Sequence, residues 1–219
     1  MSEKMSTGTR DRLVTAVAEL MRVHGYSAVT VKQITVASGA PMGSLYHHFP
    51  GGKPQLAAEA LRTSGAAYIQ LLPLLMDPHD DLRAAVPAAF AAAADAIEQS
   101  GWMNMCPVGT VAGEIADSEP DLRAVAAEVV TDWIDRGTSY FVRRGLTPTD
   151  AREIILAILS ALEGAFILSR TLRSAEPLHA AGAAMAARLE NLLRAPKAAA
   201  APQGANRDLD ATRAAADQG

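Results

Sequence analysis

One short stretch, residues 40–53, gathers hydrogen-bonding side chains on a single predicted helix. It reads A-P-M-G-S-L-Y-H-H-F-P-G-G-K, with two histidines, a tyrosine, a serine and a lysine. In a helix from Pro41 to Phe49, Leu45 and Phe49 share one face, which can pack inward. The hydroxyl, imidazole and amino groups are then available to phosphates and base edges in a DNA groove. The stretch therefore predicts a DNA recognition helix.

Five residues suit contact with phosphate. Tyr46, His47 and His48 favour this role. His48 leans toward the packed face and can instead be a core histidine. A metal site is disfavoured, because adjacent helical residues point about 100° apart and no cysteine or carboxylate stands nearby. The Thr30 hydroxyl can cap a helix, meet a phosphate, or do both. Lys53 opens the next helix, where the helix dipole disfavours a cation, so a phosphate partner is favoured over plain solvation.

Base recognition is assigned to Lys32, Met42, Gly43 and Ser44. A lysine can read guanine O6 and N7, a methionine can touch a thymine methyl, and serine is tolerant of several bases. Glycine permits close approach of the backbone to DNA. Met42 can alternatively be a residue at the edge of the core.

Two preceding helices must position this stretch. From Thr9 an apolar residue recurs every three or four positions, which predicts a helix with one buried stripe, ending at Gly25. The sequence Thr30-Val31-Lys32-Gln33 is a capping box that opens a second, short helix. Gly39 predicts a left-handed turn, and Pro41 is expected at the first position of the third helix. Helix, glycine turn and helix, preceded by a supporting helix, form a helix-turn-helix pattern.

Charge is unevenly divided along the 219 residues, whose net charge is −4. Residues 1–62 hold seven Lys/Arg against four Asp/Glu, a net charge of +3, and the remainder carries −7. A basic head on an acidic body fits DNA binding by the head alone. The polar residues 1–8 predict a disordered tail, in which Lys4, together with Arg10 just beyond it, either reaches a minor groove or stays solvated.

Composition also bounds where the chain works. The single cysteine, Cys106, excludes an intrachain disulfide and fits a reducing compartment. The first residues form no apolar signal segment, and no window reaches about 18 uncharged apolar residues. We therefore expect a soluble, cytoplasmic protein that is neither secreted nor membrane-spanning.

Residues 10–62 resemble the DNA-binding head of the TetR family of bacterial transcriptional repressors. The matching residues are Gly25-Tyr26, Thr30, Ile34, Gly39, Gly43, Leu45-Tyr46-His47-His48-Phe49 and Lys53. Thr35 and Ser38 stand where that family usually has alanine, and the link Pro50-Gly51-Gly52 is one residue longer than usual. The segment F-P-G-G-K, together with Cys106-Pro107-Val108-Gly109-Thr110, resembles the LmrA/YxaF-like branch.

The resemblance implies an all-α fold in which an N-terminal three-helix DNA-binding domain precedes a helical-bundle domain for ligand binding and dimerisation. The expected boundaries are a disordered tail at 1–8, the helix-turn-helix domain at 9–52, the linking helix and body at 53–194, and a disordered tail at 195–219. The implied partners are a near-palindromic DNA operator, a small lipophilic effector and a second copy of the chain. The helix expected at about 148–173 is apolar on almost every side, so it needs cover from a second chain. With the helix at about 177–193 it would form the dimer interface.

Aromatic and sulfur-containing side chains in the body are candidates for lining a ligand cavity, because they suit flat, lipophilic guests. Plain core packing is the alternative for each of them. Glu163 lies inside the most apolar helix, where a carboxyl is costly unless it is paired. Either Arg170 pairs with it, or it hydrogen-bonds to a ligand. The ligand-binding candidates are Tyr68, Phe90, Trp102, Met103, Met105, Cys106, Trp133, Glu163 and Phe166.

Two other functions remain open at this stage. A helical enzyme or redox sensor could use Cys106, although no nucleophile elbow, phosphate loop, H-E-x-x-H motif or paired carboxylates accompany it. A partner-binding bundle without a DNA role is the other. The sequence calls for no cofactor and no metal, and the favoured interpretation is a repressor rather than an enzyme.

Overall fold

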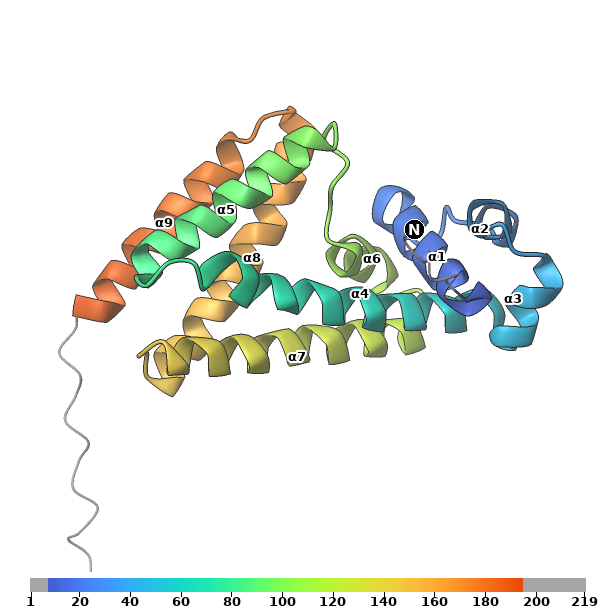
Figure 1. Ribbon diagram of the computed structural model, residues 1–219, viewed down its shortest axis with the longest axis horizontal. Helices are drawn as coiled ribbons and strands as arrows, with labels where there is room; N and C mark the ends of the chain where they lie inside the picture. Colours follow the sequence, from blue (N-terminus) through green and yellow to red (C-terminus); the bar gives the residue numbers. More distant parts are fainter. Residues whose placement is uncertain (1–7, 195–219) are drawn as a thin grey trace, which may run out of the picture.

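The computed structural model describes residues 8–194, and within them the chain forms nine α-helices and no strand (Figure 1). The all-α fold with an N-terminal helix-turn-helix is confirmed. Of the predicted disordered tails at 1–8 and 195–219, residues 1–7 and 195–219 lie outside the described part of the chain, and Gly8 is the N-cap of the first helix. The domain boundary between residues 52 and 53 stays a prediction.

The head consists of α1 (Thr9–His24), α2 (Val31–Ser38) and α3 (Met42–His48). The capping box is present, since the Thr30 hydroxyl accepts from the Gln33 amide and the Gln33 side chain accepts from the Thr30 amide. Gly39 ends α2 in the left-handed conformation, with φ of 63°. The expected place of Pro41 was wrong by one residue. Its ψ of 150° is extended, so Pro41 is the N-cap and α3 begins at Met42.

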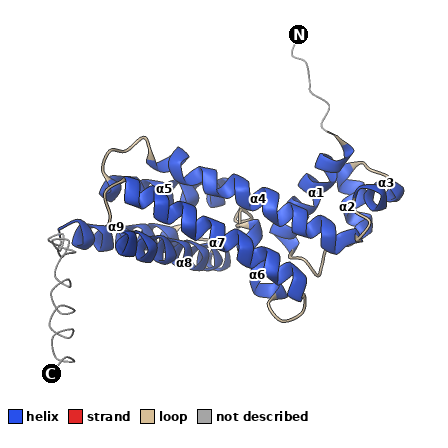
Figure 2. Cartoon of the chain, turned by 90° about the horizontal axis from the view of Figure 1, so that it is seen from below, coloured by secondary structure: helices blue, strands red, loops and turns tan. Residues whose placement is uncertain are grey.

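Six further helices form the body: α4 (Gly52–Met76), α5 (Leu82–Gln99), α6 (Pro107–Ile115), α7 (Pro120–Arg143), α8 (Pro148–Leu172) and α9 (Glu176–Arg194). The long helix α4 leaves the head and runs beside α7 into the body (Figure 1). Seen from below, the head lies at one end of the molecule and the α5, α8 and α9 bundle lies at the other (Figure 2). Pro73 does not end α4, which continues to Met76.

Two hydrophobic clusters hold these elements together. The first joins head and body, because Leu13, Ile34 and Leu45 belong to the same cluster as Val111 and Trp133. The second is built by α5, α7, α8 and α9, together with the end of α4. The head is therefore packed directly on α4 and α6, and a movement of either helix acts on it.

Helix α8 is long and apolar enough to cross a membrane by length and composition alone. In the structure it packs against α7 and α9 instead. Its other side exposes Ile167, Leu168 and Leu172, which are 57%, 53% and 63% accessible. The predicted all-round apolar character of this helix thus corresponds to one covered face and one uncovered face.

Candidate functional site

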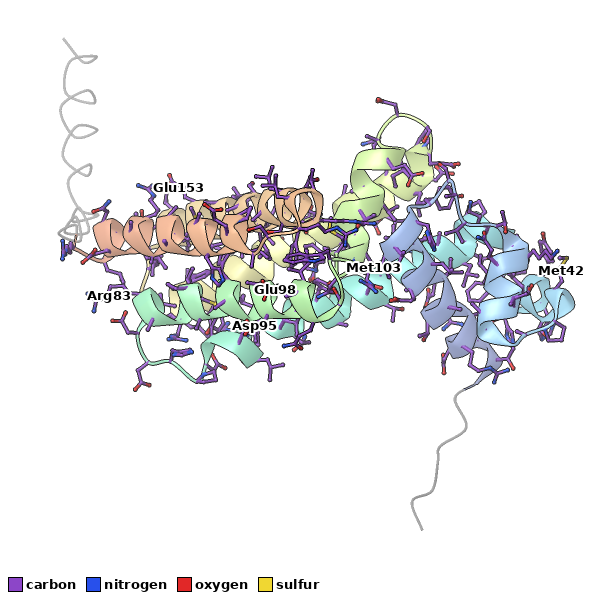
Figure 3. All side chains as sticks on the ribbon, turned by 90° about the horizontal axis from the view of Figure 1, so that it is seen from above. Met42, Arg83, Asp95, Glu98, Met103 and Glu153 are labelled. Carbon is purple, nitrogen blue, oxygen red and sulfur yellow. The ribbon has the colours of Figure 1, made fainter. Side chains whose placement is uncertain are left out.

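Helix α3 presents one buried face and one exposed face. Leu45 is fully buried and Phe49, directly after the helix, is nearly so. Met42 and Tyr46, which lie one turn apart beside this buried face, are about half exposed, at 52% and 49%. Met42 projects from the outer end of the head (Figure 3). The exposed face therefore combines a flexible thioether with a phenol hydroxyl, which can meet a thymine methyl and a phosphate respectively.

The remaining predicted residues of α3 divide by exposure. Gly43 and His47 are exposed, and Ser44 and His48 are half-buried. Nothing within 4 Å would meet a Cβ at Gly43, so this position leaves free space next to the helix. The two imidazoles lie edge to face, with centroids 5.1 Å apart. His48 is accordingly neither a core histidine nor a freely projecting one.

Helix α2 adds a second strip to the same head. Thr30 and Lys32 are exposed, and the Thr30 hydroxyl also donates to the Gln33 side chain at 2.8 Å. Val36 lies one turn after Lys32 and is 74% exposed. The sequence reasoning missed Val36, although its spacing of four residues from Lys32 places both on one face. An uncovered valine there can contact thymine methyl groups.

Lys53 is held by an aromatic ring. Its Nζ lies 4.1 Å from the centroid of the Tyr26 ring, a cation–π contact. Partial burial lowers the pKa of Lys53, and the carboxylates of Glu114 and Glu119 oppose that shift. Arg10 is likewise engaged, in an ion pair with Glu59 at 2.7 Å. Lys4, the other arm candidate, lies outside the described residues.

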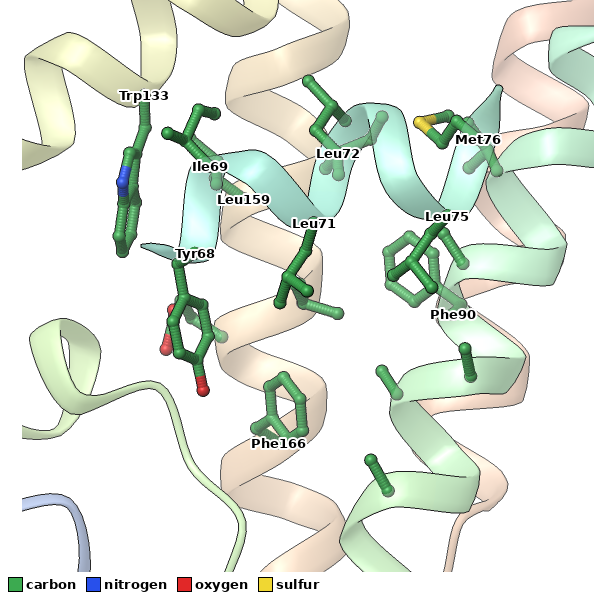
Figure 4. A pocket seen from close by; sticks show the side chains of 18 of the residues that line it. Tyr68, Ile69, Leu71, Leu72, Leu75, Met76, Phe90, Trp133, Leu159 and Phe166 are labelled. Atoms are coloured by element: carbon green, nitrogen blue, oxygen red, sulfur yellow. The ribbon is translucent and has the colours of Figure 1, made fainter. Parts of the chain in front are cut away.

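The body contains a cavity of about 300 Å³ bounded by α4, α5, α7 and α8, with Asn104 from the segment before α6. Tyr68 and Trp133 line one side, Phe90 lies across from them, and Phe166 lies between (Figure 4). Leucine, isoleucine and alanine side chains form most of the remaining wall. Such an apolar chamber with few polar groups has the size and character of a small-molecule site.

The ligand-binding candidates fall into two groups. Tyr68, Phe90, Trp133, Glu163 and Phe166 line this cavity. Trp102, Met103, Met105 and Cys106 do not: Met105 and Cys106 are buried in the core, Trp102 is half-buried, and Met103 is 44% exposed. A local run of apolar and sulfur-containing residues indicates that a segment is partly buried. It does not indicate whether the side chains line the cavity or pack in the core.

Several lining residues carried no signal in the sequence reasoning. The α5 alanines Ala89, Ala92, Ala93 and Ala96 form one wall by being small, and Leu71 and Leu75 of α4 form another. Alanines at helical spacing near Phe90 are the one pattern that could have indicated this wall, because small side chains beside large ones leave space.

Polar groups gather at the α6 side of the cavity. The Tyr68 hydroxyl donates to the Met105 carbonyl at 3.1 Å. Glu163 lies against the first turn of α6, where a Cβ added at Gly109 would overlap its Oε2 atom. The Cys106 thiol hydrogen-bonds to the Glu163 carboxyl, and its sulfur accepts from the Gly109 amide. Burial raises the pKa of Glu163 and, more strongly, that of Cys106.

Arg170 does not pair with Glu163. Its guanidinium donates to the Val23 carbonyl at 3.3 Å and so ties α8 to the end of α1. Within residues 8–194, Glu163 forms no salt bridge, and no cluster of three metal-ligating side chains occurs.

Helix α6 connects the cavity to the head. The carboxylate of Glu114, near the end of α6, accepts hydrogen bonds from the Tyr26 and Ser27 amides at 2.6 and 2.7 Å. A Cβ at Gly25 would overlap this carboxylate, so the turn after α1 needs glycine there. Burial favours a higher pKa for Glu114, but the bonds from Ser27 and Tyr26 outweigh it and lower the pKa. We call Glu114 with the residue 25–27 backbone the head clamp.

A second contact lies beside the head clamp. Arg22 of α1 donates to the Met103 carbonyl at 2.6 Å and is paired with Glu19. It also approaches Oδ1 of the cavity residue Asn104, at 3.5 Å. The end of α6 and the segment before α6 are therefore both joined to the end of α1 or to the turn after it.

A helix-turn-helix head with an exposed third helix, joined to a helical body with an apolar chamber, defines the class of helix-turn-helix transcriptional regulators. Residues 13–60 match the model of bacterial regulatory proteins of the tetR family, and residues 83–184 match that of the LmrA/YxaF-like transcriptional regulator C-terminal domain. The chain belongs to the TetR family, in its LmrA/YxaF-like branch. Members of this family are DNA-binding regulators that act as dimers on operators, and they are not enzymes.

Curated relatives span most of the chain. The HTH-type regulator YxaF of Bacillus subtilis is 31% identical over 170 residues, covering 78% of this chain and 89% of the relative. The HTH-type regulator LmrA of the same species is 30% identical over 175 residues, covering 80% and 93%. An uncharacterized HTH-type regulator of Mycobacterium tuberculosis, Rv0196, is 34% identical over 186 residues, covering 78% and 89%.

Solved structures share the fold. A TetR regulatory protein from Rhodobacter sphaeroides superposes with a TM-score of 0.72 at 23% identity, covering 82% of this chain and 98% of that one. A TetR regulator from Chloroflexus aurantiacus gives a TM-score of 0.67 at 27% identity, covering 83% and 94%.

Proposed function

We propose that this regulator is a homodimeric repressor that a small lipophilic molecule releases from its operator. The observation that carries the proposal is the position of α6. Its first turn lies against Glu163, a residue of the cavity lining, and its last turn holds the head through Glu114. A ligand that displaces one end of this short helix therefore acts on the other.

Two heads, held by a dimer of bodies, would occupy successive major grooves of a near-palindromic operator, about one helical turn apart. The predicted DNA contacts are Thr30, Lys32, Met42, Gly43, Ser44, Tyr46, His47, His48 and Lys53, and we add Val36 because it is exposed on the same face of α2 as Lys32. We assign the protein to the cytoplasm, where the operator is found.

The dimer interface is proposed on α8 and α9. The uncovered face of α8 carries Ile167, Leu168 and Leu172, and Leu193 of α9 is 40% exposed. Such side chains on two long neighbouring helices are suited to a four-helix bundle with the symmetry-related pair.

Release follows from a shift between two populations. One arrangement of the heads fits the operator spacing, and a ligand in the cavity favours another that does not. A coupling of a few kcal/mol is typical of such systems and is reciprocal, so operator DNA weakens ligand binding by the same factor.

Cys106 does not support the alternative of an enzyme or a redox sensor. Its side chain is buried, and burial raises the pKa of the thiol, so the reactive thiolate is disfavoured. Its contacts with Gly109 and Glu163 are those of a core residue packed beside the cavity lining.

A mobility-shift assay tests the proposal. The probe is the DNA flanking the protein's own coding region, with a scrambled duplex as control, titrated with a panel of small lipophilic compounds. We expect a specific protein–DNA complex, and we expect at least one compound to dissociate it. Specific binding that no cavity-binding compound alters would contradict the ligand-release mechanism. Equal binding to the scrambled duplex would contradict sequence-specific recognition of an operator in the flanking DNA.

A further inference from the structure

The cavity pairs an aromatic and aliphatic lining with a single carboxyl group. Glu163 faces the cavity from α8, and Phe166 follows it three residues later on the same side of the helix. Tyr68 and Trp133 form a stacked pair across from α8, with centroids 6.2 Å apart. With Phe90, the wall thus offers one carboxyl group and four aromatic rings.

The carboxyl group of Glu163 has no counterion among the described residues. Arg170, the nearest basic residue on its own helix, donates to the Val23 carbonyl, and Arg22 is paired with Glu19. The described residues place no Lys, Arg or His in a salt bridge with Glu163. Among residues 8–194 its side-chain hydrogen-bond partner is the Cys106 thiol, a weak and neutral donor. A buried carboxylate in this situation is costly until a cation reaches it.

Resting on the proposed function, we propose that the effector is a lipophilic amine, whose ammonium group binds Glu163 while its apolar part fills the cavity between Tyr68, Phe90 and Phe166. A charge-assisted hydrogen bond to the carboxylate is stronger than one from a neutral donor. The ring faces of Tyr68, Trp133 and Phe166 also attract a cation. A ligand carboxylate would place two anions together in a chamber with no base, so acids are excluded.

The volume of the cavity and the net charge of the body are both consistent with a lipophilic amine as the ligand. A cavity of about 300 Å³ holds a ligand of one or two rings with a short chain. Residues 63–219 carry a net charge of −7, which favours the approach of cations over anions.

The test is calorimetric titration of the free protein, without DNA, with three probes on one skeleton: phenylbutylamine, phenylbutanol and phenylbutanoate. We expect the amine to bind about tenfold more tightly than the alcohol, because a charged hydrogen bond replaces a neutral one, and the acid to bind most weakly. Equal affinities for amine and alcohol, or preference for the acid, would overturn the assignment.

Two matched variants locate the effect. Glu163→Gln keeps the shape of the side chain and removes its charge, so its affinity for the amine should fall to that for the alcohol. Glu98→Gln removes an exposed carboxylate on α5, outside the cavity lining, and should leave the preference intact. Loss of the preference in Glu98→Gln, or its survival in Glu163→Gln, would contradict direct pairing. Should Glu163→Gln fail to fold, the amine-to-alcohol ratio of the unaltered protein decides.

The test of the ligand class can fail independently of the test of ligand-induced release. Glu163-dependent amine binding that leaves the operator complex intact would contradict release by ligand while supporting the ligand class. Release of the operator by phenylbutanol but not by phenylbutylamine would overturn the ligand class and support release.

Discussion

Lys53 is a charged residue of the head whose surroundings restrict its role. Its ammonium lies over the Tyr26 ring beside the start of α4, so its position is held before DNA arrives. A pre-positioned cation loses less side-chain entropy when it meets a phosphate. The half-buried His48 and Ser44 are similarly fixed by their packing.

Lys53→Ala should weaken binding to all DNA sequences alike and reduce the slope of log affinity against log salt by about one unit. Lys32→Ala is the matched variant, and it should instead relax preference at one base pair. Both are measured by fluorescence anisotropy at several salt concentrations. An unchanged slope in Lys53→Ala would contradict the assignment of Lys53 to a phosphate contact.

Glu163 should make folding stability depend on pH. Burial raises its pKa above the ordinary 4.5, so over the interval above that value the unfolded chain has lost a proton that the folded chain retains. Stability therefore falls as pH rises through this interval. The free energy of unfolding of Glu163→Gln relative to the unaltered protein should accordingly increase as the pH rises above about 4.5. Urea unfolding at one protein concentration measures this, with Glu98→Gln as the control. A difference that does not vary with pH would show that Glu163 is not desolvated.

At the scale of elements, the head helices could be predicted from local chemistry. The Thr30 and Gln33 capping box, Gly39 and the buried pair Leu45 and Phe49 are signals within a few residues of one another. The start of α3 was misplaced because proline suits both the N-cap and the first helical position, and only the backbone ψ angle separates them.

The cavity could be predicted only in part, because its walls come from four helices. Large or charged residues such as Trp133 and Glu163 can be identified as candidates from their residue type. Ala92 contributes to the cavity because its small side chain leaves space, and residue type alone does not indicate this. The head clamp joins Glu114 to residues 26 and 27 across 87–88 positions, and no local pattern indicates that contact.

Helix α6 should protect the turn between α1 and α2. Glu114→Ala removes the acceptor of the Tyr26 and Ser27 amides, so their hydrogen exchange should accelerate by about tenfold or more. Asp117→Ala, an exposed carboxylate just beyond α6, is the control and should leave both amides unchanged. Exchange measured by NMR or mass spectrometry decides. If the Tyr26 and Ser27 amides exchange at an unchanged rate in Glu114→Ala, then Glu114 does not connect α6 to the head.

At the scale of the whole molecule, the uncovered face of α8 should hold two copies together. Ile167→Glu places a charge within this apolar face and should convert the dimer to a monomer in light scattering. Leu74→Glu changes a leucine of similar exposure, 67%, on α4 and should leave the dimer intact. A dimer that survives Ile167→Glu would place the interface elsewhere.

Whole-molecule coupling is the central claim, and reciprocity tests it most directly. The affinity of the operator is measured by anisotropy with and without saturating phenylbutylamine, and the affinity of the amine is measured with and without operator DNA. The account predicts that each ligand weakens the other by the same factor, on the order of 5- to 150-fold. Independent binding of the two, with neither affinity changed by the other ligand, would contradict it.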